Sequence, residues 1–326
     1  MSFYYKLIPL TACLFGCGQN GSSVSTQGNS SAVVISNPIN GFQVLPKDNA
    51  WNTDISGYPV HTNSSNYINS MGLSGHVHPD FGTEWEGAPI GIPYAIVDAH
   101  NTPLLPINFE YADESDTGPY PIPADVPIEG GNSSDGDRHI LLVDTTASKL
   151  YELWHAYPPG HAANPSKTQW YAGSGVIFDL SSNTLRPNGF TSADAAGLPI
   201  FPGLARYDEA VTLGAIHHAL RFTAVRTQKA YIHPATHQAG ASTDANLPPM
   251  GLRVRLKASF DTTGYSPEVR TILLALKTYG MLLADNGSNW YISGAPDSRW
   301  NDEHLAELSK LQGQDFEAVE TGALHQ

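Results

Sequence analysis

Residues 139–157 read HILLVDTTASKLYELWHAY, and this stretch decides the fold class of the chain. It contains two runs of strand-forming residues, His139–Asp144 and Lys149–Tyr157, with a short polar turn between them. Such a pattern predicts a β-hairpin. Because side chains alternate across a strand, Glu152 and Trp154 are expected on the same face of the second strand.

Other strand-like runs lie on both sides of this hairpin, separated by Pro and Gly. They are Gly41–Leu45, Tyr94–Asp98, Pro106–Tyr111, Trp170–Leu180, His217–Val225, Lys229–Ile232 and Leu252–Phe260. No internal repeat is visible, which disfavours solenoids and propellers. The pattern predicts a mainly β fold, an antiparallel β-sandwich of jelly-roll-like type.

Helical patterns occur only near the C-terminus. Ser266-Pro267-Glu268 supplies an N-cap, a first-turn proline and a first-turn acid, and apolar residues with helical spacing follow up to Gly280. A second helix is expected from Asn301 or Asp302 to Leu311. The sandwich should therefore carry a few flanking α-helices close to the end of the chain.

The start of the chain predicts export and lipid attachment. The apolar run Leu7–Phe15 is too short to span a bilayer, and it leads into Leu14-Phe15-Gly16-Cys17, the pattern of a bacterial lipobox. Cleavage before Cys17 would leave its thiol to carry lipid, and Gly18 after it favours the outer membrane. An ordinary signal peptide cut elsewhere is the alternative.

This leader defines the expected domain organisation. Residues 1–16 would be a lipoprotein signal peptide, 17–36 a flexible tether rich in Gly, Ser, Asn and Gln, and 37–326 a single β-rich domain. The predicted location is the bacterial cell envelope. Contact with the membrane is expected only through the lipid on Cys17.

Composition excludes several classes of function. The two cysteines, Cys13 and Cys17, both lie in the leader, so the domain has no disulfide and no thiol chemistry. The net charge is −14, from 17 basic and 31 acidic residues, without the basic clusters that nucleic-acid binding needs. Abundant Tyr, Trp, Asn and Gly suit a secreted β protein and suit sugar binding. They also suit a Tyr-rich core.

Carboxylates are the candidate catalytic groups. Glu152 lies in mid-strand beside Trp154, and burial in a partly apolar cleft would raise its pKa as a proton donor requires. Glycoside cleavage needs a second carboxylate, for which Asp194 and Glu209 are the candidates. Three structural alternatives remain open: a solvent-facing Glu152, Asp194 as a first-turn helix acid, and an ion pair of Glu209 with Arg206.

Histidine, arginine and aromatic residues complete the predicted site. His139 and His237 would position substrate or move a proton. The expected substrate-binding residues are Trp154, Arg138, Arg206, His218 and Tyr120. No cofactor is expected; a weak candidate for a metal site has the spacing His76, His78 and Asp80.

From about His78 onward the chain resembles a group of uncharacterised secreted bacterial proteins. The strings that carry this likeness are His78–Gly82, Asp113–Pro123, Asp137–His139, Thr191–Glu209, His218–Thr223, Pro249–Asp261 and Tyr279–Trp300. This group has no known activity, so the resemblance implies no function. Separately, Tyr151-Glu152-Leu153 followed by an aromatic residue is similar to the nucleophile strand of jelly-roll cellulases.

The sequence therefore predicts a lipid-anchored, secreted, carbohydrate-active enzyme, a glycoside hydrolase that acts on a polysaccharide with paired carboxylates. One alternative is a glycan-binding lipoprotein without catalysis. Another is a polysaccharide lyase, in which Arg138, His139 and Tyr151 would act on a uronic acid. The acidic net charge argues against an anionic substrate.

Overall fold

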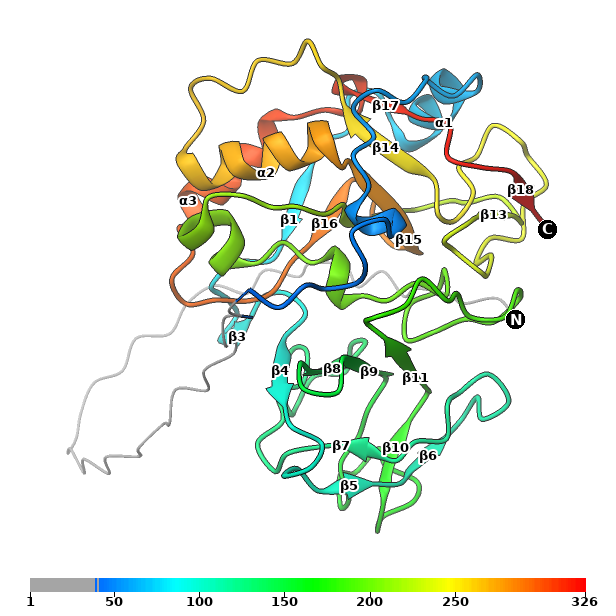
Figure 1. The fold of residues 1–326 in the computed structure, drawn as a ribbon, viewed down its shortest axis with the longest axis vertical. Coiled ribbons are helices and arrows are strands. Elements are labelled where there is room, and N and C mark those ends of the chain that lie inside the picture. Colours follow the sequence, from blue (N-terminus) through cyan, green and yellow to red (C-terminus); the bar gives the residue numbers. More distant parts are fainter. Residues whose placement is uncertain (1–38, 40) are drawn as a thin grey trace, which may run out of the picture. The chain divides into compact units, whose positions relative to one another are not determined.

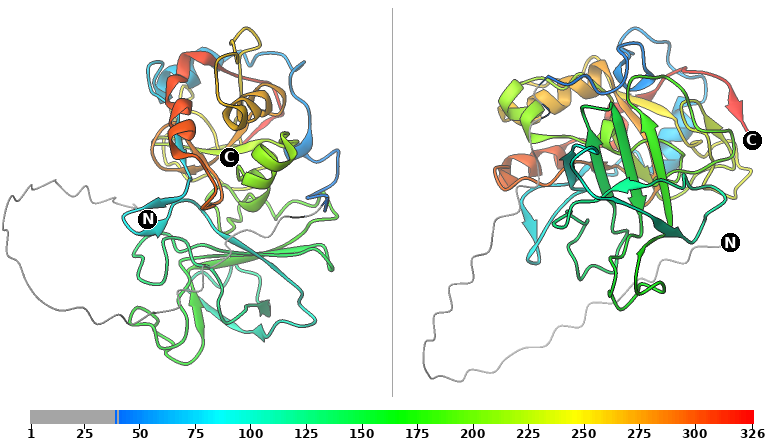
Figure 2. Two further views of the ribbon diagram at one scale, coloured as in Figure 1. Left: turned by 90° about the vertical axis from the view of Figure 1, so that its left-hand side faces the viewer. Right: turned by 60° about the horizontal axis from the view of Figure 1, so that its bottom comes forward.

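The predicted hairpin is present and forms the centre of a four-stranded sheet. Strands β8 (Ile140–Asp144) and β9 (Lys149–Trp154) pair antiparallel. β11 (Ser174–Asp179) pairs antiparallel with the outer side of β9, and β4 (Tyr94–Val97) pairs parallel with β8. The order is β11-β9-β8-β4, and the right view of Figure 2 shows the green strands of this sheet running alongside one another.

The computed structural model describes residue 39 and residues 41–326. The expected signal peptide (1–16), the tether (17–36) and Cys17 lie outside these residues. The described residues form one compact unit. Within the described part of the chain, no helix has the length and apolar character that crossing a membrane requires.

The larger sheet has six strands in the order β1-β16-β12-β15-β14-β17. β1 pairs parallel with β16 and β12 pairs parallel with β15, whereas the other neighbours are antiparallel. Its strands are β1 (His78–Asp80), β12 (Leu220–Ala224), β14 (Arg253–Leu256), β15 (Met281–Asn286), β16 (Tyr291–Ser293) and β17 (Phe316–Ala318).

The remaining strands form four two-stranded pairs: β10 with β6, β13 with β18, β2 with β3, and β5 with β7. Their bounds are β2 (Glu84–Trp85), β3 (Ala88–Pro89), β5 (Leu104–Leu105), β6 (Ile107–Phe109), β7 (Tyr120–Pro121), β10 (Trp170–Ala172), β13 (Tyr231–Ile232) and β18 (Leu324–His325). The fold is thus mainly β, as predicted, but both larger sheets contain parallel pairs that the expected antiparallel pattern lacked.

The described residues form three α-helices, four 3₁₀ turns and one π-helix (Figure 1). The α-helices are α1 (Ser64–Met71), α2 (Pro267–Thr278) and α3 (Asp302–Leu305). The 3₁₀ turns are η1 (Ala50–Asn52), η2 (Phe201–Gly203), η4 (Ala306–Lys310) and η5 (Gly313–Asp315), and the π-helix is η3 (Asp208–Leu213).

Helix α2 confirms the prediction made from its start signals. The second predicted helix is only four residues long and continues as the 3₁₀ turn η4. Its apolar residues explain the change, because Leu305, Leu308 and Leu311 are spaced by three and all are buried. A spacing of three matches the 3₁₀ helix, which has three residues per turn.

Two apolar clusters lie on the two faces of the four-stranded sheet. Leu141 and Val143 belong to the main core, which also contains Phe222 of the six-stranded sheet. Ile140 and Leu142, which point the other way, belong to a smaller core with residues of β7 and β10. All of β8 is therefore buried, and side chains on the main-core face of this sheet point toward the six-stranded sheet.

Candidate functional site

One face of the six-stranded sheet presents a row of polar side chains. His78 on β1 lies opposite Tyr291 on β16, which lies opposite Thr223 on β12. Thr223 in turn lies opposite Asp285 on β15. Residues opposite one another in a sheet share a face, so this row runs across four strands and ends at a carboxylate.

A β-bulge places Asp285 in this row. The register of β12 and β15 shifts after Phe222, so that Ala284 is an extra residue on β15 and Thr223 pairs with Asp285. If Ala284 were instead paired in a regular ladder, strict alternation would turn Asp285 to the opposite face of the sheet. The carbonyl of Ala284 accepts a hydrogen bond from the amide of Ala196 at 3.0 Å, which ties the bulge to the neighbouring loop.

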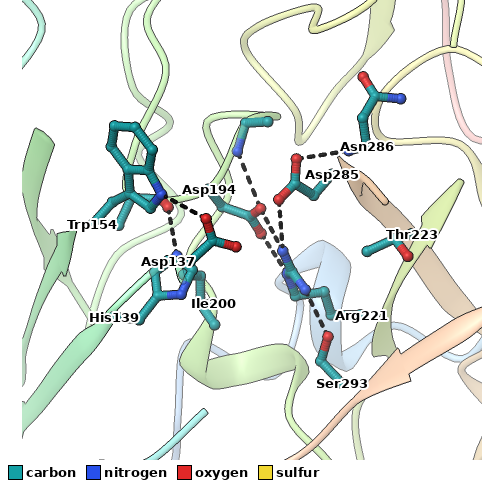
Figure 3. Close-up of polar contacts among 12 residues, drawn as sticks. Asp137, His139, Trp154, Asp194, Ile200, Arg221, Thr223, Asp285, Asn286 and Ser293 are labelled. Carbon is teal, nitrogen blue, oxygen red and sulfur yellow. Dashed lines mark hydrogen bonds and ion pairs between the residues drawn. The ribbon is translucent and has the colours of Figure 1, made fainter. Parts of the chain in front are cut away.

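Arg221 lies on the same face and joins two carboxylates (Figure 3). Its guanidinium donates to both oxygens of Asp194 at 2.8 Å, to Asp285 at 3.3 Å and to the hydroxyl of Ser293 at 2.6 Å. Asp194 is completely buried, whereas 28% of the Asp285 side chain is exposed. Arg221 therefore neutralises Asp194 fully and reaches Asp285 at longer range.

Asp285 has the proton affinity of an acid that functions at neutral pH. Burial and the nearby charge of Asp194 raise the pKa of Asp285 to about 7, against the opposing effect of Arg221. The charge of Asp137 adds to this rise. A partly exposed carboxyl group with such a pKa holds its proton near neutrality and can still release it to a bound molecule.

Asp137, at the end of the loop before β8, lies near the polar face that carries Asp285. It is exposed, and the indole N–H of Trp154 donates to it at 3.2 Å. Asp80 on β1 is also exposed, and desolvation by surrounding protein raises its pKa, to which the charges of Glu129 and Asp137 contribute. Asp137 thus lies within electrostatic range of both Asp80 and Asp285.

His139 is a buried cation that supports this loop. Its Nδ1 contacts Glu129 at 2.6 Å and its Nε2 contacts the carbonyl oxygen of Ala193 at 3.1 Å. Burial opposes a charge on the ring, but Glu129 outweighs it and raises the pKa of His139 to about 9. Both ring nitrogens face acceptors, so His139 donates two hydrogen bonds and has no free nitrogen with which to move a proton.

Glu152 does not line an open cleft. It is completely buried, and its carboxylate accepts hydrogen bonds from the backbone amides of Ile200 at 3.0 Å and Phe201 at 2.9 Å. Burial raises the pKa of Glu152 to about 7, and these amides oppose the rise. Alternation correctly predicted the face, but that face is covered by the start of η2.

We expect Glu152→Gln to destabilise the fold by about 1–3 kcal/mol, because the side-chain NH2 group would face the N–H of Ile200 in the interior, donor against donor, where Oε2 of Glu152 accepts a hydrogen bond. Thermal unfolding measures this, with Glu303→Gln at an exposed position as the control. An unchanged melting temperature with lost catalytic activity would instead support the catalytic role expected from the sequence.

Glu209 belongs to a separate buried cluster. It forms an ion pair with Arg206 at 2.6 Å and contacts His218 at 3.0 Å. Although burial opposes its charge, these two partners lower the pKa of Glu209 to about 2. The ion pair considered for Glu209 and Arg206 is present, and the structure does not bring this cluster together with Asp285.

Three further candidates have structural contacts. Arg138 is completely buried and donates to four backbone carbonyls, three of them in residues 131–134. Tyr120 is also buried, with its hydroxyl donating to the carbonyl of Asp116 at 2.7 Å. Neither contacts solvent as a substrate-binding residue would. Half-buried His237 is bonded through Nδ1 to the carbonyl oxygen of Ala195 at 2.9 Å, beside the Asp194 segment.

The residues of the candidate metal site have other contacts. His76 contacts the carbonyl oxygen of Ser309 at 2.6 Å through Nδ1, and the ring of His78 packs 4.2 Å from that of Tyr291. Among residues 39 and 41–326, no three His, Cys, Asp or Glu side chains are grouped as metal ligands.

Sequence patterns did not single out Asp285, Arg221, Glu129 or Asp137 as site residues; all but Glu129 occur within the strings that carry the resemblance. Asp285 directly follows the apolar run 281–284, and an acid at the end of an apolar strand was a usable signal. Arg221 alternates with apolar neighbours in His218–Thr223 and could have been recognised as facing a polar layer.

No protein-family model, curated protein or solved structure matches this chain.

Proposed function

We propose that this protein is a glycoside hydrolase in which Asp285 is the general acid and Asp137 is the second carboxylate. The observation that carries the proposal is the pKa of Asp285, raised to about 7 in a carboxyl group that is 28% exposed and faces the charge of Asp137. Two carboxylates in unlike environments are the arrangement that glycoside cleavage uses.

The two residues have distinct roles in this proposal. Asp285 protonates the leaving glycosidic oxygen, because its proton is retained near neutral pH. Asp137 is exposed and oriented by the Trp154 indole, and it attacks the sugar or activates a water. Arg221 positions Asp285 and Asp194, and His139 positions Glu129.

The other two functions have less support. A lyase would need Arg138 and His139 at an accessible surface, and both are buried with their hydrogen bonds directed to protein groups. A glycan-binding protein without catalysis would use the same aromatic surface. It would not depend on the proton of Asp285.

Export and anchoring are part of the proposal and rest on the sequence alone. The lipid on Cys17 would hold the enzyme at the cell envelope, with the polysaccharide as its partner. The acidic net charge of −14 supports a neutral or cationic substrate and not a nucleic acid.

The test is reducing-end release from a panel of neutral, cationic and anionic polysaccharides by wild type and Asp137→Asn. We expect release from at least one polysaccharide and a loss of at least about a hundredfold in Asp137→Asn, the scale of one acid–base group. Asp125→Asn, at an exposed loop position, is the matched control and should act like wild type.

Full activity of Asp137→Asn on a confirmed substrate would contradict the assignment of Asp137. Binding of a glycan without release of any reducing end would instead identify a glycan-binding protein.

A further inference from the structure

A connected series of aromatic rings begins next to Asp137. Trp154 lies 6.3 Å from Tyr111 and 5.2 Å from His155, measured between ring centroids. His155 lies 4.9 Å from Tyr157, which lies 6.5 Å from Tyr171. Tyr111 is 37% exposed, and Trp154, His155 and Tyr171 are partly exposed. We call these rings the aromatic surface; it consists of Tyr111, Trp154, His155 and Tyr171, which lie over buried Tyr157. It adjoins Asp137 of the proposed acid pair.

Contacts with Gly173 and Asp137 hold the ring of Trp154 in place. A Cβ added at Gly173 would lie 2.3–2.4 Å from two ring atoms of Trp154, so only glycine leaves room for the ring there. The indole N–H is fixed by Asp137 at 3.2 Å. The ring thus packs closely on the backbone of Gly173, which interrupts the expected strand 170–180. The partly exposed ring is preorganised for stacking, at little cost in side-chain entropy.

Two acidic side chains, Glu110 and Asp137, form hydrogen bonds with rings of this surface. Glu110 accepts a hydrogen bond from the Tyr171 hydroxyl at 2.9 Å. Glu110 and Asp137 both raise the pKa of His155, although burial of the ring lowers it overall and favours the neutral form. Arg138, the cation beneath, lies over the Tyr157 ring at 4.5 Å and is completely buried. A ligand on the aromatic surface therefore meets negative charge and no accessible guanidinium from Arg138.

We propose that this aromatic surface binds a polysaccharide of amino sugars whose amines are free and protonated. The proposal rests on the proposed function and names its substrate class. The rings stack on the apolar C–H faces of the sugars, and Asp137 and Glu110 attract the ammonium groups. A protonated amine also favours the negative faces of the Trp and Tyr rings. A uronic acid would be repelled by the same carboxylates.

The experiment measures binding of soluble oligosaccharides of equal length by calorimetry at mildly acidic pH. The probes are oligomers of glucosamine, N-acetylglucosamine and glucose, and the protein is the full chain carrying Asp285→Asn, so that cleavage does not interfere. We expect the glucosamine oligomer to bind at least about tenfold more tightly than the other two, a difference of about 1.4 kcal/mol. Salt should weaken this preference.

Variants then assign the binding to this surface. Trp154→Ala should weaken binding of the glucosamine oligomer about tenfold or more, the range of a buried aromatic anchor, and Trp154→Phe should recover most of it. Glu110→Gln should reduce the preference for glucosamine over glucose. Trp85→Ala removes a tryptophan that is 70% exposed on the β2–β3 hairpin and should leave binding unchanged.

Equal binding of the three oligomers, or tight binding that survives Trp154→Ala, would overturn the proposal. Preferential binding of the glucosamine oligomer with no cleavage by wild type would support this surface and contradict the hydrolase. Cleavage of a neutral polysaccharide alone would support the hydrolase and overturn the amino-sugar assignment.

Discussion

Replacing Asp285 with asparagine should lower turnover on a confirmed polysaccharide substrate at least about a hundredfold, the usual contribution of one general acid. The amide keeps the shape of the carboxyl group and can still accept a hydrogen bond from Arg221, but it has no acidic proton to donate. Reducing-end release under saturating substrate measures the loss. Wild-type turnover in Asp285→Asn would exclude Asp285 as the acid.

The same variant should be more stable than wild type above neutral pH. The pKa of Asp285 is about 7 in the folded protein against an ordinary 3.8, so between these values the folded state holds a proton that the unfolded chain has lost. The contribution of Asp285 to stability is therefore full below the lower value and is lost as pH rises through the higher one. Asparagine does not ionise, so the melting temperatures of wild type and variant, compared at one pH below and one pH above neutrality, measure this contribution.

Arg221→Met should have the largest effect on folding. Arg221 is the charged partner of Asp194, which is completely buried, and removing it leaves an uncompensated carboxylate in the interior. Loss of one partner of a buried ion pair costs about 3–5 kcal/mol. Thermal or denaturant unfolding measures the change, and Arg226→Met, at an exposed position at the end of the same strand region, is the control.

A second substitution tests the reason for that loss. In the double variant Arg221→Met, Asp194→Asn the buried charge is gone, so stability should partly return. If the double variant is as unstable as the sum of the two single variants, the ion pair is not the cause and the packing of the Arg221 side chain is.

Much of the fold could be predicted because it depends on local patterns. The hairpin of β8 and β9 and helix α2 follow from alternation and from capping residues close in sequence. The parallel pairing of β12 with β15 could not, because segments some 60 residues apart meet only after folding and no local signal specifies their register. The face of Glu152 was predicted correctly, but what covers that face was not.

The candidate site was harder to predict for the same reason. Its carboxylates come from β1, from the loop before β8, from the loop that carries Asp194 and from the end of β15. Glu152 and Glu209 are carboxylates of the type that catalysis needs. However, Glu152 already accepts hydrogen bonds from backbone amides, and Glu209 already forms an ion pair with a buried arginine. Distinguishing an acid that is available from one that is already bonded requires the contacts themselves.

The extra residue at Ala284 has a consequence for how such a protein changes over time. Asp285 faces this side of the sheet because the register shift lets it pair with Thr223, although it lies two residues after Leu283. Deletion of Ala284 would place the acid directly after Leu283, where simple alternation again puts it opposite Thr223. The strand can therefore differ in length by one residue while the acid keeps its direction, so related chains with and without the extra residue should share the same chemistry.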